Sequence, residues 1–351
     1  MNYQEKGGKY RAGIVGCGRI GSEFDDDPLR KTVSTHAGAY TVNNDIDLVA
    51  ASDLDSKRLA KCGKRWGIPS LYPDYREMLK EQKLDILSVC TWNSTHLDIV
   101  REAVSSGVKA IFCEKPIADS LNHADEMIKM CQENGVILQV DHQRRFDRTH
   151  QEIRDFLQTG RLGRIQQVTF YYTAGIANTG SHMFDLLRFF FGDVEWVQAV
   201  DSSNQSPNPK DPDFDGVLRF KNGVSCTVQA CDVRDFLIFE MACIGTEGRL
   251  NITRSGFGVE YYGVKESELF SGYKELFPAA LPFHADSSRN FMVNAVIHLV
   301  KCLKEGRQPV SSGEDGRSAL ELICAFHESA KLDGLKVSLP LHDSQISIQS
   351  S

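Results

Sequence analysis

The tripeptide Glu114-Lys115-Pro116 carries the groups best suited to chemistry in this chain. It follows the apolar run 110–113, which predicts a buried strand. A lysine in that place stands at the carboxyl edge of a parallel sheet, where open α/β folds bind their ligands. Pro116 fixes φ and removes a backbone donor, so the turn is stiff, and Glu114 is close enough to tune or anchor the ammonium group. Taken alone, the pattern fits equally well a surface strand end followed by a helix-starting proline.

A phosphate-binding pattern near the N-terminus gives the tripeptide its context. The segment Gly16-Cys17-Gly18-Arg19-Ile20-Gly21 follows the apolar run 12–15. Its glycines allow a tight turn, a close approach of backbone to a pyrophosphate, and packing of a helix on a strand. A second predicted strand, 47–52, ends at Asp53, whose carboxylate would accept hydrogen bonds from ribose hydroxyls. Because no arginine follows directly, the pattern favours NAD over its 2′-phosphorylated relative.

The spacing between these two elements is unusual. Asp53 lies 32 residues after Gly21, whereas about 20 is the ordinary spacing. An insertion at 23–34 explains the excess and carries Asp25-Asp26-Asp27-Pro28. Because proline breaks a helix, we expect the first helix to stop there and to resume near 35–37. We expect the three aspartates to form a solvated loop, with a lid over the cofactor or a subunit contact as the alternatives.

Composition narrows the class of protein. A chain of 351 residues exceeds one comfortable hydrophobic core, so two domains are expected. The net charge of −7, without a basic run, argues against a nucleic-acid surface. No apolar stretch is long enough to span a membrane, and residues 1–10 are too polar for a signal peptide. Ten scattered cysteines without a C-x-x-C pair predict a reducing cytoplasm, free thiols and no metal site.

The order of predicted elements changes near residue 141. Before it, strands and helices alternate, which predicts a parallel, doubly wound Rossmann sheet. After it, strands dominate and predict an α+β domain with a large, open, mostly antiparallel sheet. We therefore predict a cofactor-binding domain over 1–141 and a substrate-binding and oligomerisation domain over 142–351. The helices expected to cover the second sheet are 181–191, 290–305 and 316–332, and the polar stretch 201–214 is expected to be a surface loop.

An ordered set of motifs extends this interpretation. The glycine pattern, Asp53, Thr91-Trp92-Asn93-Ser94-Thr95-His96, Glu114-Lys115-Pro116 and the segment 178–185 occur in that order. Together they resemble the glucose-fructose oxidoreductase / inositol dehydrogenase / MocA family over nearly the whole chain. The resemblance implies an N-terminal Rossmann domain that binds a nicotinamide cofactor. It also implies a C-terminal domain that supplies the substrate pocket and often the subunit interface.

The resemblance assigns roles to individual residues. Lys115 matches the family's active-site lysine and His182 its catalytic histidine, while Trp92 stands where the family has proline. Without the family pattern, His182 would be better explained as a core histidine on a helix. The positions that would contact the cofactor are Gly16, Gly18, Arg19, Ile20, Gly21, Asp53, Thr91, Asn93, His96, Glu114, Lys115 and Gln143.

Substrate contacts are expected from four residues: Asn178, Asp185, Arg144 and Arg145. Asn178 departs from the aspartate of inositol dehydrogenase-like members, and an amide hydrogen-bonds a hydroxyl but takes no proton at neutral pH. In carrying Asn-x-Gly-x-His, this chain resembles the family members that oxidise a nucleotide-linked N-acetylhexosaminuronate. Asp185 either orients His182 or makes a structural bond. Each arginine either faces an anionic substrate or forms a solvent-facing salt bridge.

The chemistry expected is hydride transfer between NAD(H) and a secondary alcohol or ketone of a sugar or sugar nucleotide. Histidine suits the proton and lysine stabilises the developing alkoxide. The alternatives are an inositol or polyol dehydrogenase, a redox-neutral enzyme of the NAD-dependent glycosidase type, and a cofactor-binding regulator without turnover. A homodimer or homotetramer is expected, because an open sheet with an apolar face is rarely left in water.

Overall fold

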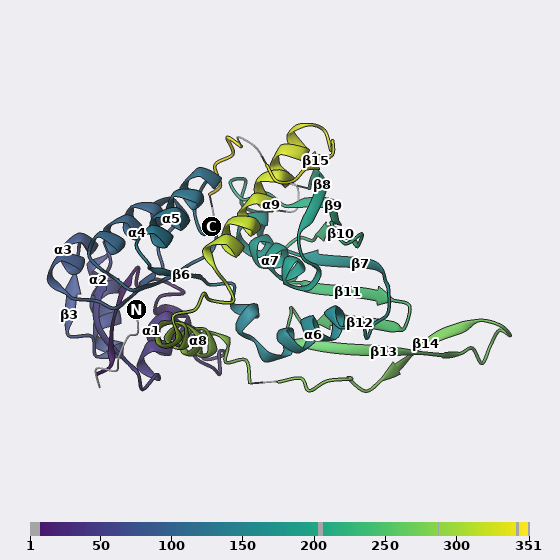
Figure 1. Ribbon diagram of the computed structural model, residues 1–351, viewed down its shortest axis with the longest axis horizontal. Coiled ribbons are helices and arrows are strands. Elements are labelled where there is room, and N and C mark those ends of the chain that lie inside the picture. The colour runs from purple at the N-terminus through teal and green to yellow at the C-terminus, as the bar shows by residue number, and fades with distance from the viewer. Residues whose placement is uncertain (1–7, 203–205, 287, 342–343, 350–351) are drawn as a thin grey trace. The chain divides into compact units, whose positions relative to one another are not determined.

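The computed structural model describes residues 8–202, 206–286, 288–341 and 344–349 (Figure 1). It divides into two compact units, Met1–Asp147 with Ser288–Arg317, and Arg148–Ser287 with Ser318–Ser351. The first unit is built on a six-stranded sheet and the second on a nine-stranded sheet. The predicted fold class is therefore confirmed. The functional division at residues 141 and 142 stays a prediction.

The first sheet is parallel throughout and has the strand order β3-β2-β1-β4-β5-β6. The order reverses between β1 and β4, and ligands of such sheets bind at the carboxyl ends of the strands beside that reversal. Both faces are covered, so the central strands are almost wholly apolar and buried. The strands are β1 (Tyr10–Val15), β2 (Ile46–Ser52), β3 (Ser70–Tyr72), β4 (Ile86–Val89), β5 (Ala110–Cys113) and β6 (Ile137–Val140).

Several helices of the first unit begin at side-chain caps that the sequence supplies. Asp55 accepts the amides of Lys57 and Arg58, and Ser120 accepts that of His123. These helices are α1 (His36–Thr41), α2 (Ser56–Trp66), α3 (Tyr75–Glu81), α4 (His96–Ser105), α5 (Leu121–Glu133) and α8 (Phe291–Glu305), with the short helices η1 (Glu23–Asp26), η2 (Asn93–Thr95) and η3 (Gln143–Phe146).

Helix α8 corrects one expectation. The helix was expected to cover the second sheet, but it belongs to the first unit. Its buried residues Met292 and Leu299 share one core with Ile14 and Phe112, and Gln139 Nε2 donates to the carbonyl of Ala295 (3.1 Å). The insertion leaves α1 only six residues long. A short α1 cannot cover its face of the sheet, and α8 lies beside it and completes the cover (Figure 1).

The second sheet has the order β14-β13-β12-β11-β7-β10-β9-β8-β15, antiparallel except for the pair β7 and β10. Helices α7 and α9 cover one face, with the rings of Phe184 and Phe326 4.8 Å apart. The elements are α6 (Arg148–Gln158), β7 (Ile165–Tyr172), η4 (Gly175–Thr179), α7 (Gly180–Phe191), β8 (Val194–Asp201), β9 (Phe214–Phe220), β10 (Ser225–Ala230), β11 (Phe239–Gly245), β12 (Gly248–Thr253), β13 (Gly258–Glu266), β14 (Lys274–Ala279), α9 (Gly313–Lys331) and β15 (Val337–Ser338).

Strand β14 was missed by the sequence analysis. It contains Pro278, which argues against a central strand. β14 stands at the edge of the sheet, where a missing N–H is tolerated, and it forms with β13 a hairpin that extends beyond the other strands (Figure 1).

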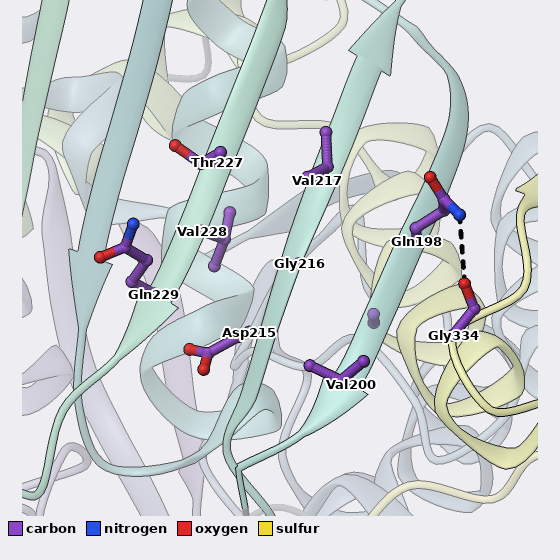
Figure 2. A pocket seen from close by; sticks show the side chains of 10 residues that line it. Gln198, Val200, Asp215, Gly216, Val217, Thr227, Val228, Gln229 and Gly334 are labelled. Atoms are coloured by element: carbon purple, nitrogen blue, oxygen red, sulfur yellow. Dashed lines mark hydrogen bonds between the residues drawn. The ribbon is translucent and has the colours of Figure 1, made fainter.

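The uncovered face of the second sheet is more polar than expected. Its exposed or partly exposed residues include Gln167, Thr169, Glu240, Arg219, Thr227 and Gln229 alongside Val217, Ala242 and Ile244. A hollow of about 500 Å³ lies over β8, β9 and β10 on this face, lined by Gln198, Asp215, Val217 and Gln229 among others (Figure 2). The face is therefore mixed rather than uniformly apolar, and the expected dimer or tetramer stays a prediction. Within the described ranges, no helix is long and apolar enough to cross a membrane.

Candidate active site

The glycine turn after β1 has the geometry of a phosphate cradle. Gly16 has a φ of +95°, and a Cβ there would lie 2.7 Å from the carbonyl oxygen of Cys90. A Cβ on Gly21 would lie 2.1 Å from the carbonyl oxygen of Gly16. A Cβ on Gly18 would meet nothing within 4 Å, so that side of the turn is open to a ligand. The turn thus fits the pyrophosphate of a dinucleotide, with Arg19 and Ile20 between the second and third glycines.

Asp53 is held firmly at the end of β2. Its Oδ2 accepts the amide of Cys17 in the glycine turn (2.7 Å), and its Oδ1 accepts the amide of Asp55 (2.8 Å). The sequence analysis missed Arg58, whose Nη1 lies 3.9 Å from Oδ1. The carboxylate is therefore tied to the turn that would hold the pyrophosphate, as a ribose-binding acid must be.

The insertion is only partly the solvated loop that was expected: residues 26–31 are exposed, but two of its aspartates are bonded to neighbouring helices. Asp25 accepts the amide of Ser34 (2.7 Å) and the hydroxyl of Thr35, which caps α1. Asp26 pairs with Lys61 (2.7 Å) and with Arg65 on α2. These bonds close the insertion onto two helices, and α1 begins at the expected place.

The segment after β4 braces the loop that carries Lys115. Burial lowers the pKa of His96, so its ring is neutral and one nitrogen carries the proton. Nε2 lies 3.0 Å from the carbonyl oxygen of Thr91, and Nδ1 lies 3.1 Å from that of Ile117 and 3.4 Å from the thiol of Cys113, so the neutral ring donates to one of the two carbonyls. Asn93 donates to the carbonyl of Ala118 (3.2 Å). Thr91, Asn93 and His96 thus fix the loop, and their predicted contact with the cofactor stays a prediction.

Glu114 anchors the backbone of Lys115. Its Oε2 accepts the Lys115 amide (3.2 Å), and its Oε1 lies 3.1 Å from Nε2 of the buried His36. Glu114 is 7% exposed, and Lys115 is half-buried at the carboxyl end of β5. Burial raises the pKa of Glu114, and the charge of Lys115 opposes that rise. His36 was missed as a site residue, although its place at the first turn of the resumed helix was a usable signal.

The three predicted site residues on η3 divide into two groups. Gln143 and Arg144 are half-buried on η3. Arg145 is 6% exposed and engaged within the first unit, where it donates to the carbonyl of Val310 (2.8 Å) and pairs with Asp315 (3.0 Å). For Arg145 the geometry favours the salt-bridge alternative over a substrate contact, and the bridge is buried rather than solvent-facing.

In the second unit, Asn178 and His182 lie one turn apart. Asn178 is on η4 and His182 on α7, and both are half-buried. Asp185, one turn further along, is 1% exposed. The hydroxyl of Ser181 donates to the carbonyl of Asn178 (2.8 Å), which joins the two helices. The structure therefore brings the cofactor set together in the first unit and the histidine set together in the second.

Two buried aspartates hold the turn that presents Asn178. Asp211 accepts the amides of Ala177 (2.7 Å) and Asn178 (3.0 Å), and Asp213 accepts that of Gly175 (2.9 Å). Gly175 has a φ of +88°, and a Cβ there would lie 2.2 Å from Asp211. The expectation of a surface loop at 201–214 is therefore wrong for its last residues, where both carboxylates are buried.

Comparison with known proteins extends the motif pattern. The model of the oxidoreductase family with an NAD-binding Rossmann fold matches residues 10–142, and the model of its C-terminal alpha/beta domain matches residues 173–339. The chain belongs to the Gfo/Idh/MocA oxidoreductase family. Its first unit is accordingly an NAD-binding Rossmann domain.

Curated relatives cover nearly the full length of this family member. A D-apiose dehydrogenase from Paraburkholderia graminis is 27% identical over 94% of this chain and 90% of its own length. A myo-inositol 2-dehydrogenase from Thermotoga maritima is 27% identical over 91% of this chain and 96% of its own.

Among solved structures, the WlbA dehydrogenase of Bordetella pertussis in complex with NADH and UDP-GlcNAcA has a TM-score of 0.76 at 23% identity, covering 95% of this chain and 100% of its own. A levoglucosan dehydrogenase in complex with NADH has a TM-score of 0.77 at 17% identity, covering 95% of this chain and 99% of its own. These two likenesses establish the shared fold.

Proposed function

We propose that the protein transfers a hydride between NAD(H) and a secondary alcohol or ketone of a sugar or sugar nucleotide. The observation that carries this proposal is the place of Lys115, anchored by Glu114 at the same sheet edge as the glycine turn and Asp53. That edge is where a Rossmann sheet binds its dinucleotide. The dehydrogenases among the relatives support the reaction class.

Lys115 and His182, one from each unit, would act on the same hydroxyl. The imidazole of His182 accepts the hydroxyl proton, because histidine titrates near neutrality. The ammonium of Lys115 stabilises the alkoxide that develops. A bound nicotinamide supplies the hydride acceptor. Asn178 holds a substrate hydroxyl by hydrogen bonds and takes no proton itself.

A nucleotide-linked sugar is the finer part of the proposal. Its support is the sequence Asn178-Thr179-Gly180-Ser181-His182, which matches the pattern of family members that oxidise a nucleotide-linked hexosaminuronate. The structure of WlbA with UDP-GlcNAcA supports the same substrate class by its shared fold. The relatives that act on D-apiose and myo-inositol favour a free sugar or polyol instead. A panel of free sugars, inositols and UDP-sugars, assayed for NADH formation, distinguishes the two.

Two substitutions test the catalytic pair on whichever substrate the panel yields. Lys115→Met should lower kcat about 10²-fold with cofactor affinity retained, because a charge stabiliser is lost. His182→Ala should lower it comparably and flatten the pH–rate profile near neutrality. The matched controls are Lys109→Met and His123→Ala. Lys109 is an exposed lysine directly before β5, and His123 lies on α5. Near-normal rates in both site variants would place the chemistry elsewhere.

The same experiment separates the remaining alternatives. Cofactor that stays bound through purification, with product formed but no net NADH, would indicate redox-neutral chemistry. Tight cofactor binding without turnover on any member of the panel would indicate a regulator. We expect neither, because Lys115 and His182 are both present and both half-buried rather than sealed in a core.

A further inference from the structure

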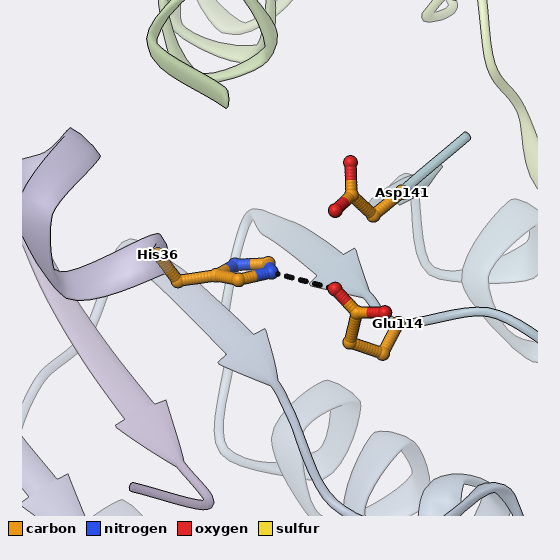
Figure 3. A group of neighbouring side chains, drawn as sticks. All are labelled: His36, Glu114 and Asp141. Atoms are coloured by element: carbon orange, nitrogen blue, oxygen red, sulfur yellow. Dashed lines mark hydrogen bonds and ion pairs between the residues drawn. The ribbon is translucent and has the colours of Figure 1, made fainter. Parts of the chain in front are cut away.

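Behind Lys115, three buried titratable side chains meet in the first unit. His36 comes from α1, Glu114 from the end of β5 and Asp141 from the residue after β6 (Figure 3). One imidazole nitrogen of His36 and one carboxylate oxygen from each acid lie within 4.8 Å of one another. All three are under one-tenth exposed, with His36 at 0% and Asp141 at 2%. Neither His36 nor Asp141 has a part in the mechanism proposed above.

The hydrogen bonds of the cluster include one donor–acceptor arrangement that leaves Glu114 ionised. Burial lowers the pKa of His36 to about 4, so its ring is neutral. Nδ1 lies 2.8 Å from the hydroxyl of Ser88, whose oxygen lies 2.6 Å from that of Tyr40. If Tyr40 donates to Ser88 and Ser88 to Nδ1, then Nε2 carries the proton and donates to Glu114. Glu114, which also accepts the Lys115 amide, is then the ionised member of the cluster.

Asp141 is the neutral partner of that carboxylate. Its Oδ1 finds no N–H or O–H donor among the described residues. Its carboxyl lies close enough to Glu114 to hydrogen-bond to it, and burial together with that neighbouring charge holds the pKa of Asp141 well above its usual range. Ionising both of two buried carboxyl groups in contact costs much free energy, because like charges repel and neither is solvated. The pair therefore shares one proton.

We propose that His36, Glu114 and Asp141 form a proton-binding site that holds one more proton when NADH is bound than when NAD⁺ is bound. The inference rests on the proposed function. Oxidation of a secondary alcohol breaks its C–H and O–H bonds and forms a C=O bond. The hydride goes to NAD⁺ and the hydroxyl proton passes through His182 to solvent, while the Glu114 carboxylate takes up one proton from solvent. The carboxyl pair then carries two protons in place of one, so atoms and charge balance.

The driving force is electrostatic. Strands β4, β5 and β6 make up the second half of the Rossmann sheet. The nicotinamide half of a dinucleotide binds at the carboxyl ends of these strands. The oxidised ring carries a positive charge that favours an ionised Glu114, and the reduced ring does not. The other titratable groups close to the pair are Lys115, Cys90, Cys113, Tyr40 and the adjacent His142. Burial raises the pKa of Cys90, Cys113 and Tyr40, so these three stay protonated.

Cofactor binding alone tests the proposal. The dissociation constants of NAD⁺ and NADH are measured by calorimetry or fluorescence between pH 6 and pH 9, a window of about three units around neutrality. Because the NADH complex binds the extra proton, the preference for NADH over NAD⁺ should rise as pH falls, by up to about tenfold per pH unit. In Asp141→Asn, Glu114 loses its acidic partner and stays ionised with either cofactor, so the preference should vary less than about twofold.

Two further variants keep the test decisive. Glu114→Gln should flatten the same pH dependence, and it replaces Asp141→Asn in the test if that variant folds poorly. Thermal melting reports which variants are folded. Asp98→Asn, an exposed carboxylate on α4, should keep the wild-type slope.

A wild-type preference that does not change with pH would overturn the proposal, as would equal slopes in wild type and folded Asp141→Asn. So would one equivalent of a metal ion retained by the purified protein and lost in Asp141→Asn. No sugar is present, so a failed substrate screen leaves this inference standing. If wild type binds neither NAD⁺ nor NADH, the proposed function itself is wrong.

Discussion

Replacing Asp211 by asparagine should disturb His182, the proposed catalytic histidine, from a distance. The Asp211 carboxylate is 1% exposed and accepts two consecutive amides, those of Ala177 (2.7 Å) and Asn178 (3.0 Å). Asparagine keeps one acceptor oxygen but turns its own N–H₂ toward the other amide. One charge-assisted bond is lost, and one buried amide is left without an acceptor.

The magnitude follows from those two losses. A hydrogen bond to a charged group contributes about 1.5–3 kcal/mol, and a buried orphaned donor costs a similar amount, so the overlapping losses come to about 3 kcal/mol. A domain has about 5–15 kcal/mol of stability, so the variant should remain folded at 25 °C. The turn that carries Asn178, one turn ahead of His182, would relax. A shift of about 1 Å at a catalytic group costs about 10²-fold in rate.

Urea unfolding and steady-state kinetics on the substrate found by the panel measure the two effects. We expect kcat to fall far more than KM rises, because His182 would be misplaced while the cofactor site in the other unit is untouched. Asp235→Asn, an exposed aspartate of the same unit, is the control. If Asp211→Asn loses less than about 0.5 kcal/mol of stability and less than twofold in kcat, then the two amide bonds do not position the site.

Three further predictions concern the cofactor, the pH and the assembly. Asp53→Ala should weaken the preference for NAD(H), measured as the ratio of NAD⁺ to NADP⁺ affinities, and tighter binding of NADP(H) by wild type would contradict the assignment. Burial raises the pKa of Asp213 to about 6, so its contribution to stability is full below about pH 4 and is lost as pH rises toward about 6. In Asp213→Asn that decline should be smaller in thermal melts across the same range. Light scattering at micromolar concentration should give a dimer or tetramer mass, and a monomer mass would refute the expectation.

The parts of this protein that could be predicted from sequence depend on local patterns. The glycine turn, Asp53 and Lys115 each lie at the end of an apolar strand, and a parallel sheet places all such ends on one edge. Local strand patterns far apart in the sequence thus defined positions close in space. Asn178 and His182 were predicted only through the family resemblance, and they lie close together because four residues make about one helical turn.

The parts that were missed depend on long-range contacts. Asp211 reaches a turn more than thirty residues earlier in the chain, and its neighbours Pro207, Asn208 and Pro209 are typical of a surface loop. His36 hydrogen-bonds Glu114, which lies 78 residues later in the chain, and no rule of sequence spacing connects the two. Helix α8 is amphipathic and would suit either sheet, and only the shortness of α1 decides which sheet it covers.

Because α8 completes the first unit, that unit is assembled from two separated stretches of chain. During synthesis the glycine turn and all six strands emerge early, yet one face of their sheet keeps Ile14 and Phe112 exposed until residues 291–305 leave the ribosome. The whole of β7 to β14 is made in that interval. A fragment that ends at Asp147 would therefore present an apolar sheet face and should aggregate rather than bind cofactor. A single-chain fusion of residues 8–147 to 288–317 through a flexible linker is the smallest piece expected to fold as a cofactor-binding unit.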